Sequence, residues 1–422
     1  MNRRTLVALA LILLATSAHA QSDAVAARID RILRDTPLID GHNDLPWQYR
    51  ERAQDHLAKI DLRQDQSALT PPLHTDIPRL RKGRIGGQFW SVYVPTTLHG
   101  ADAVQAVIEQ IDVVHRIDAQ YPETFELART ADDVVRIHRA GKIASMIGVE
   151  GGHSIGNSLA VLRQLYALGA RYMTITHSEN DDFADSATAD PVHDGLTPFG
   201  KLVIGEMNRL GMLVDISHVA PKTMNDVLDV TQAPVIFSHS SARALTDHAR
   251  NVPDAVLQRM KANDGVVMVS WVPTFSSEKA RQWDASKEAE EARLKALFHG
   301  QPAEVKARLT NWQAANPSPH ATVKDVADHI DHVVQIAGPT HVGLGADLDG
   351  ITSTPEQLDS VAAYPLLFAE LIRRGYSDEQ LAGLAGANVL RVMRKAEAVA
   401  ARLQKESVPS DVRIDEVDKP RP

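Results

Sequence analysis

LIDGHND, residues 38–44, is the stretch from which the rest of the chain can be interpreted. Its apolar start, Leu38 and Ile39, is typical of a buried strand, in which alternate side chains point to the same face. His42 and Asp44 would then share one face at the end of that strand. An imidazole beside a carboxylate suits two ligands of one divalent metal. In isolation, a simple hydrogen-bonded His–Asp pair would be the favoured interpretation.

Seven further runs of similar composition follow, and amphipathic segments typical of helices lie between them. The runs are 88–94, 144–150, 172–178, 212–218, 234–240, 265–271 and 341–347. The amphipathic segments are 101–119, 158–169, 199–210, 221–230, 253–263, 323–337, 355–374 and 378–403. Mostly apolar and β-branched runs are expected of buried parallel strands. Eight strand–helix repetitions predict an α/β fold, a (β/α)8 barrel of the TIM type.

The longest insertion in this pattern is residues 272–322, after the seventh run. Its middle, SEKARQWDASKEAEEARLKALF, is rich in Ala, Glu, Lys and Arg and predicts an exposed helical segment. The insertion follows the carboxyl end of a strand, where barrels of this type have their active sites. It is therefore either a lid or a solvated surface helix.

The composition excludes several classes of site. The chain has no cysteine, which excludes a thiolate nucleophile, a Cys-ligated zinc and a disulfide. Its 18 histidines, with Asp and Glu, are the available metal ligands. The net charge of -9 and the lack of a Lys/Arg cluster argue against a nucleic-acid partner.

The two ends of the chain are predicted to lie outside the barrel domain, which we assign to residues 21–405. A basic start, an apolar run over 6–15 and an A-x-A-like motif predict a secretory signal peptide over 1–20, cleaved after Ala20. The run is shorter than the ~20 residues that a spanning helix needs, so an uncleaved anchor is the less favoured alternative. We expect an exported protein, periplasmic or secreted, without a stable membrane anchor. The polar segment 406–422 is expected to be disordered.

Ionisable side chains recur at the carboxyl ends of the predicted strands. They are His42, Asp44, Glu150, His177, His218, His239 and Asp347. In a (β/α)8 barrel these ends meet at one mouth, and buried ionisable groups are costly unless they are paired or bind a metal. We therefore predict two metal sites, one with His42 and Asp44 and one with His218 and His239. Glu150 lies between them in barrel order and would bridge the two ions.

Two ions held in this way can activate one water and polarise one carbonyl group. Asp347, on the last strand, is then expected to transfer protons. His177 is expected on the substrate side, where it would stabilise the developing oxyanion.

Several motifs together resemble the membrane dipeptidase (renal dipeptidase) family, a branch of the metal-dependent amidohydrolase barrels. The motifs are GHNDLP (41–46), GVEGGHSI (148–155), RYMTITHS (171–178), VDISHV (214–219), FSHSSARAL (237–245), HARNVPD (248–254) and GADLDG (345–350). The resemblance spans residues 30–400, in family order. It implies a zinc-dependent dipeptidase with two Zn²⁺ ions per chain, which hydrolyses the peptide bond of dipeptides through a metal-bridging hydroxide. A homodimer is consistent with it.

The resemblance also implies the role of each site residue. The implied metal ligands are His42, Asp44, Glu150, His218 and His239. His177 matches the histidine that binds the substrate carbonyl, and Asp347 matches the catalytic acid/base. Arg250 is implied by the resemblance alone, as the guanidinium that binds the substrate's C-terminal carboxylate. Five other histidines fall on loops or helices and are not expected to be ligands: His153, His193, His248, His329 and His332.

Two alternatives stay open. The first is another amidohydrolase on the same barrel, which would cleave an N-acyl amino acid, a lactone or a β-lactam. The second is a non-catalytic periplasmic protein that binds peptides or metals. The complete set of ligands and acid/base groups argues against the second, because a binding protein does not need Asp347.

Overall fold

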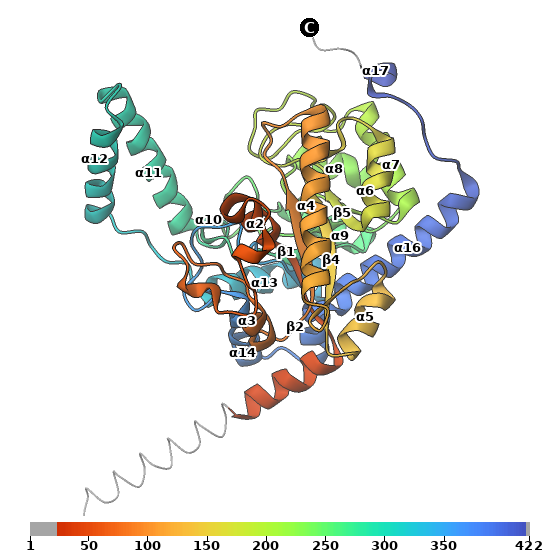
Figure 1. The fold of residues 1–422 in the computed structure, drawn as a ribbon, viewed down its shortest axis with the longest axis horizontal. Helices are drawn as coiled ribbons and strands as arrows, with labels where there is room; N and C mark the ends of the chain where they lie inside the picture. Colours follow the sequence, from red (N-terminus) through yellow and green to blue (C-terminus); the bar gives the residue numbers. More distant parts are fainter. Residues whose placement is uncertain (1–22, 419–422) are drawn as a thin grey trace, which may run out of the picture.

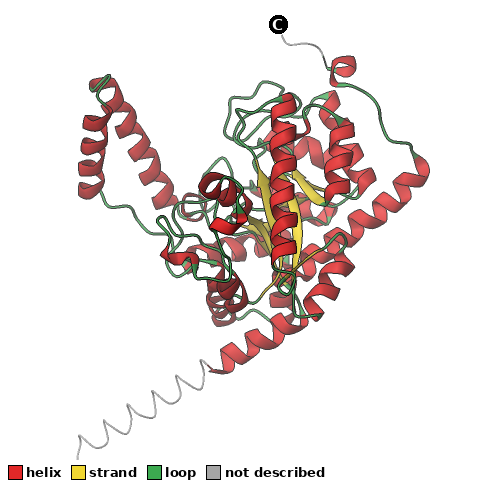
Figure 2. Ribbon diagram, in the orientation of Figure 1, coloured by secondary structure: helices red, strands yellow, loops and turns green. Residues whose placement is uncertain are grey.

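A closed barrel of eight parallel strands forms the centre of the computed structural model, which describes residues 23–418 (Figures 1 and 2). The hydrogen-bonded order is β1, β2, β4, β5, β6, β7, β8 and β9, which pairs again with β1. These strands are Leu38–Asn43, Ile85–Tyr93, Ile143–Glu150, Ala170–Thr174, Leu213–Asp215, Ile236–Phe237, Val266–Val269 and Val342–Leu344. Each of the eight predicted runs overlaps one of them, so the predicted (β/α)8 barrel is confirmed.

β2 and β4 are the longest strands and pair in register from Gly87 with Ala144 to Tyr93 with Glu150. All residues of β4 are buried, which explains its apolar sequence. Ile147 and Val149 of β4 belong to one hydrophobic cluster, and Ala144 and Met146 belong to another, because alternate side chains of a strand point to opposite faces. The additional strand β3, Phe125–Leu127, pairs with the first residues of β4 and was not predicted.

Helices surround the barrel (Figure 2). They cover residues 23–35, α2 Leu45–Ala53, α3 Ile77–Lys82, α4 Gly100–Gln120, α5 Ala131–Arg139, α6 Leu159–Leu168, α7 Pro198–Leu210, α8 Pro221–Val230, α9 Asp254–Asn263, α10 Pro273–Ser276, α11 Glu278–Leu297, α12 Pro302–Ala315, α13 Val323–Ala337, α14 Tyr364–Arg373, α15 Asp378–Ala382, α16 Asn388–Glu406 and α17 Ile414–Val417. Side-chain caps fix several starts: Ser158 caps α6, Thr197 caps α7, and Thr322 forms a capping box at α13. Every predicted amphipathic segment overlaps a helix. The helices that were not predicted are the one over residues 23–35, α2, α3, α5, α10, α12 and α17.

The insertion between β8 and α13 contains a helical hairpin, α11 and α12, which projects away from the barrel (Figure 1). Within the hairpin only Ala280, Leu294 and Val305 are buried hydrophobic residues. Trp283 and Trp312 hold the two helices together, with ring centroids 6.0 Å apart. The predicted exposed helical segment is confirmed.

The C-terminal segment after α16, which the sequence predicts to be disordered, makes specific contacts over the residues that the structure describes. The Arg163 guanidinium donates to the carbonyl oxygen of Ser410 at 2.9 Å. The Asp418 carboxylate accepts hydrogen bonds from Thr197 Oγ1 at 2.6 Å and from the Phe199 amide at 3.0 Å, at the start of α7. Individual hydrogen bonds to α6 and to the N-terminus of α7 hold this segment, and such bonds leave no periodic pattern in the sequence.

The predicted signal peptide, residues 1–20, lies outside the described residues, as do residues 419–422. Within residues 23–418, no helix combines the length and the apolar character needed to cross a bilayer.

Candidate metal centre

All seven predicted strand-end side chains meet at the mouth of the barrel. Two of them lie on strands: His42 is in β1, and Glu150 is the last residue of β4. The others lie just beyond a strand, because the strands are shorter than the apolar runs: Asp44, His177, His218, His239 and Asp347. His218 and Asp347 have φ angles of 68° and 64°, in the left-handed region that non-glycine residues rarely adopt. Such backbone strain is typical of functional sites.

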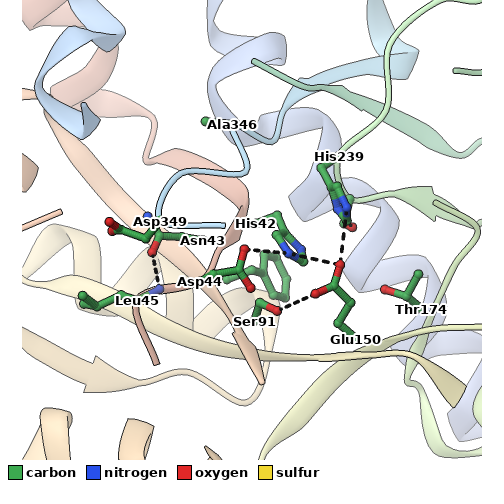
Figure 3. A network of polar contacts seen from close by, with 12 residues as sticks. His42, Asn43, Asp44, Leu45, Ser91, Glu150, Thr174, His239, Ala346 and Asp349 are labelled. Carbon is green, nitrogen blue, oxygen red and sulfur yellow. Dashed lines mark hydrogen bonds and ion pairs between the residues drawn. The ribbon is translucent and has the colours of Figure 1, made fainter. Parts of the chain in front are cut away.

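Glu150 is the centre of this cluster (Figure 3). Its Oε1 lies 3.1 Å from the Nε2 atom of His218 and 3.5 Å from the Nε2 atoms of both His239 and His42. The Nε2 atom of His177 is 3.7 Å away. Four imidazole nitrogens therefore surround one carboxylate oxygen. The other oxygen, Oε2, accepts a hydrogen bond from Ser91 Oγ at 3.1 Å.

The ligand atoms fall into groups of three that could each hold a metal ion, with all atoms of a group within 4.8 Å of one another. One group is His42, Asp44 and Glu150, and another is Glu150, His218 and His239. These two share Glu150, as the sequence prediction requires. A third group combines His42 and His239 with Asp347. None of the three groups in the described chain includes His153, His193, His248, His329 or His332.

The cluster fits cations because several imidazole nitrogens converge on Glu150 Oε1. His42 Nε2 is buried and has no hydrogen-bond partner among the described residues. The Nε2 atoms of His218 and His239 face each other at 2.9 Å. A cation bound between such nitrogens and a carboxylate would satisfy them together, and imidazole with carboxylate is a common donor set for zinc.

Hydrogen bonds behind the imidazoles orient two of these nitrogens. His239 Nδ1 lies 2.7 Å from Ser238 Oγ, which donates to Asp215 Oδ2 at 2.5 Å. Since the Ser238 proton goes to Asp215, the serine oxygen accepts the Nδ1–H of His239, and Nε2 keeps a free lone pair. His42 Nδ1 is similarly 2.8 Å from the hydroxyl of Tyr172. Partners of this kind fix the tautomer of a metal-binding histidine.

The pKa shifts of the cluster side chains show how strongly these groups influence one another. Burial raises the pKa of Glu150, but the nearby imidazoles, His42 and His177 foremost, outweigh burial and hold this pKa well below its usual range. Burial lowers the pKa values of His218 and His239 well below normal, so both rings are neutral and can bind a cation. Burial, with the neighbouring Asp44 and Glu150 carboxylates, raises the pKa of Asp347 well above its usual value.

Arg250 is buried beside His239 and is not among the residues that line the cavity. It is 3% exposed, and its guanidinium donates to the His239 carbonyl oxygen and to Ser240 Oγ, both at 3.2 Å. Its Nε atom has no hydrogen-bond partner among the described residues. Burial lowers its pKa to about 10, so the guanidinium stays charged at neutral pH.

A cavity of about 480 Å³ opens above the cluster. Its lining includes Asp44, Glu150, His177, His218 and Asp347 of the cluster, together with Trp47, Gln48, Glu51, Arg52, Pro71, Pro72, His74, Tyr93, Asp349, Gly350, Ile351 and Thr352. The second set was not predicted. A usable signal was the spacing of Trp47, Gln48, Glu51 and Arg52, which stand three, four, seven and eight positions after Asp44 and therefore share one helix face. The hairpin α11–α12 contributes no residue to this lining.

Comparisons with known proteins agree with the family resemblance found in the sequence. The family described as membrane dipeptidase (peptidase family M19) matches residues 26–407. Dipeptidase verJ of Clonostachys rogersoniana is 40% identical over 387 residues, which cover 89% of this chain and 88% of that protein. The crystal structure of the probable dipeptidase PvdM from Pseudomonas aeruginosa has a TM-score of 0.77 at 23% identity, and the match covers 90% of this chain and 100% of that chain. A metallo peptidase from Rhodobacter sphaeroides, liganded with a phosphinate mimic of the dipeptide L-Ala-D-Ala, has a TM-score of 0.70 at 23% identity, covering 86% of this chain and 100% of that one.

Proposed function

Because this chain belongs to the membrane dipeptidase family, a family of metallodipeptidases, we propose that it hydrolyses the peptide bond of dipeptides with two zinc ions bound at the barrel mouth. One observation carries this proposal. Two groups of three ligand atoms share Glu150 at the floor of a cavity of about 480 Å³. A shared carboxylate between two neighbouring sites is the arrangement that a bridged pair of metal ions needs.

The residues of the two groups divide the ligation as the sequence suggested. His42 and Asp44 would hold one ion, His218 and His239 the other, and Glu150 both. Bound zinc would supply an activated water and polarise the scissile carbonyl group. Imidazoles with Asp and Glu carboxylates suit zinc, and the geometry supports a divalent cation in general.

The remaining side chains would orient the substrate and transfer protons. His177 is a neutral imidazole at the cavity wall, because burial lowers its pKa, and it would donate a hydrogen bond to the carbonyl oxygen as negative charge develops there. Asp347 would accept a proton from the attacking water and pass it to the leaving amine. We keep for Arg250 the role that the resemblance implies, binding of the free C-terminal carboxylate, although Arg250 is buried beside His239 and does not line the cavity in this structure. This role would limit the substrates to short peptides.

Metal content measured together with activity tests this function. The protein as isolated, and after chelation, is assayed against L,L- and L,D-dipeptides, a tripeptide and an N-acyl amino acid. We expect about two zinc ions per chain, dipeptide cleavage that chelation abolishes and zinc restores, and no tripeptide cleavage. Bound metal with cleavage of the N-acyl amino acid alone would assign another amidohydrolase activity. Bound metal without any turnover would assign a binding protein.

The fate of the N-terminus belongs to the same proposal. We propose that the chain is exported and loses residues 1–20. N-terminal sequencing of the exported protein should give a start at Gln21. The homodimer stays a prediction, which sedimentation of the purified protein would test.

A further inference from the structure

Asp215, the last residue of β6, is a buried carboxylate outside the predicted ligand set. β6 lies between β5 and β7, and the carboxylate accepts hydrogen bonds from both sides. Its Oδ1 accepts the backbone amides of Ser217 and Ser238 at 3.0 and 2.9 Å. Its Oδ2 accepts the hydroxyls of Thr174 and Ser238 at 2.6 and 2.5 Å. Each oxygen therefore has two donors, and an ionised carboxylate, which only accepts, matches this environment.

This carboxylate decides where the proton of the Ser238 hydroxyl points. Ser238 Oγ has one proton and lies between two acceptors, Asp215 Oδ2 at 2.5 Å and His239 Nδ1 at 2.7 Å. A hydrogen bond to an ionised group is about twice as strong as one between neutral groups, so the proton goes to the carboxylate. His239 then donates its Nδ1–H to the serine oxygen. The lone pair of its Nε2 atom is left on the side of Glu150 (Figure 3).

His218, the other imidazole of the group that includes Glu150 and His239, has no such partner behind it. Its Nδ1 atom is buried and has no hydrogen-bond partner among the described residues. The tautomer of His218 is therefore free to change, whereas hydrogen bonds fix that of His239. Of these two rings, His239 is the one that is already held in the form that binds a cation.

We propose that Asp215 is a positioning residue that fixes the metal-binding tautomer of His239 through the hydroxyl of Ser238. The inference rests on the proposed function, because it assumes that His239 binds a metal ion through Nε2. The hydrogen-bond chain runs from Asp215 Oδ2 through Ser238 Oγ to His239 Nδ1. It ends on the ring nitrogen that does not bind the ion, so Asp215 acts on the ligand from behind.

Asp215→Asn should reverse this arrangement without changing the shape of the side chain. The two backbone amides need an acceptor, so the asparagine Oδ1 atom takes their side and the Nδ2 group faces the hydroxyls of Thr174 and Ser238. Nδ2 then donates to Ser238 Oγ, which releases the serine proton toward His239 Nδ1. The ring keeps its own proton on Nε2, where it blocks a metal ion. The same substitution of an orienting aspartate gives the wrong histidine tautomer in serine proteases.

Zinc affinity, measured by competition with a chelator, is the first test. We expect Asp215→Asn to weaken the binding of one ion per chain by at least ~100-fold, the upper end of the range for an orienting partner. Thr174→Val is the matched control, because it removes the other hydroxyl from the same Oδ2 atom and leaves the chain to His239 intact. Its affinity should change by less than ~10-fold.

The affinities also separate this inference from the proposed function. A wild-type protein that binds zinc and cleaves dipeptides, with equal affinity in Asp215→Asn, would overturn the role of Asp215 and leave the function intact. A wild-type protein that binds no divalent metal would overturn the proposed function and this inference with it.

A double variant distinguishes control of the tautomer from a merely structural role. Asp215→Asn and Ser238→Ala break the same hydrogen-bond chain, so their losses of zinc affinity should not add. The double variant should bind zinc about as tightly as Asp215→Asn alone, because the serine that misdirects its proton is gone. A further loss of ~10-fold or more would assign Asp215 an independent structural role and overturn the proposal.

The tautomer can be observed directly in protein from which a chelator has removed the metal. Two-bond proton–nitrogen correlations of the imidazole rings distinguish a proton on Nδ1 from one on Nε2, and His239→Gln identifies the signals of His239. We expect the proton on Nδ1 in the wild type and on Nε2 in Asp215→Asn, and the same tautomer in both would overturn the proposal. If Asp215→Asn does not fold, Ser238→Ala and Thr174→Val decide, and equal zinc affinities of these two variants would overturn it.

Discussion

The barrel mouth and the hairpin α11–α12 are both rich in charged residues, and they use them in opposite ways. In the hairpin the ion pairs are local and lie at the surface, for example the half-buried Glu290 with the exposed Arg293 at 2.7 Å, three residues apart in the same helix. At the mouth, His42 and Glu150 lie on two different strands, His239 follows a third, and all three are almost completely buried.

The contrast shows that burial, rather than residue type, makes charged groups interact strongly with one another. An exposed pair contributes only ~0–1 kcal/mol, because water screens it and the side chains lose entropy. Buried groups interact strongly and are costly when unpaired, so a cluster such as the mouth favours a cation that satisfies it. Substitutions should therefore have large effects at the mouth and small effects in the hairpin.

The largest effect is expected for Glu150→Gln. Glutamine has no charge to share between two metal ions, so both sites lose a ligand at once. We expect metal content to fall below that of the wild type and kcat/KM for dipeptides to drop at least ~1,000-fold, since loss of one electrostatic catalytic group alone costs ~100- to 1,000-fold. Elemental analysis and a dipeptide assay measure both. Full activity with unchanged metal content would show that Glu150 does not bridge two metal ions.

The next effect is expected for Asp347→Asn, which keeps the shape and removes the ionisable group. Loss of a general acid/base should lower kcat by ~100- to 10,000-fold. Metal content should stay unchanged if Asp347 is a proton carrier. A parallel loss of metal would instead assign it to the third ligand group, with His42 and His239.

A smaller effect is expected for Ser238→Ala, which breaks the chain from Asp215 to His239. Loss of such an orienting partner should weaken metal affinity by ~10- to 100-fold, and excess zinc should restore activity. Competition with a chelator measures the affinity. Ser286→Ala is the matched control, because its hydroxyl donates only to a carbonyl oxygen within exposed α11. Equal behaviour of the two variants would show that the hydroxyl does not orient His239.

The smallest effect is expected for Arg293→Ala in the hairpin. Removing one exposed ion pair should change the free energy of unfolding by less than ~0.5 kcal/mol and kcat/KM by less than about twofold. Chemical denaturation and the dipeptide assay measure these values. A loss of activity above ~10-fold would show that the hairpin acts at the mouth as a lid, the alternative that the sequence left open.

The barrel and the cluster could be predicted because the sequence patterns that indicate them occur several times along the chain. Eight apolar runs give eight strands, and an ionisable group at nearly every strand end indicates one shared mouth. The outer cavity wall has no repeated signal of this kind. The spacing of residues 47, 48, 51 and 52 fits one helix face, but this face lines a cavity and lacks the usual apolar stripe. β3 is only three residues long and merges with neighbouring loops in the sequence. The segment after α16 is held by individual hydrogen bonds to Ser410 and Asp418. Such bonds cannot be predicted from the amino-acid composition of the segment.

The sequence by itself determined the strand count, the residue types available as ligands and their order around the barrel. Those properties depend on local periodicity and on composition. Only the tertiary structure decided that four imidazole nitrogens surround one oxygen of Glu150, that Ser238 and Tyr172 orient the histidines behind it, and that α2 forms the cavity wall. These features depend on distances between residues far apart in the chain. Such distances are fixed by strand register, by the loops after each strand and by strained backbone at His218 and Asp347.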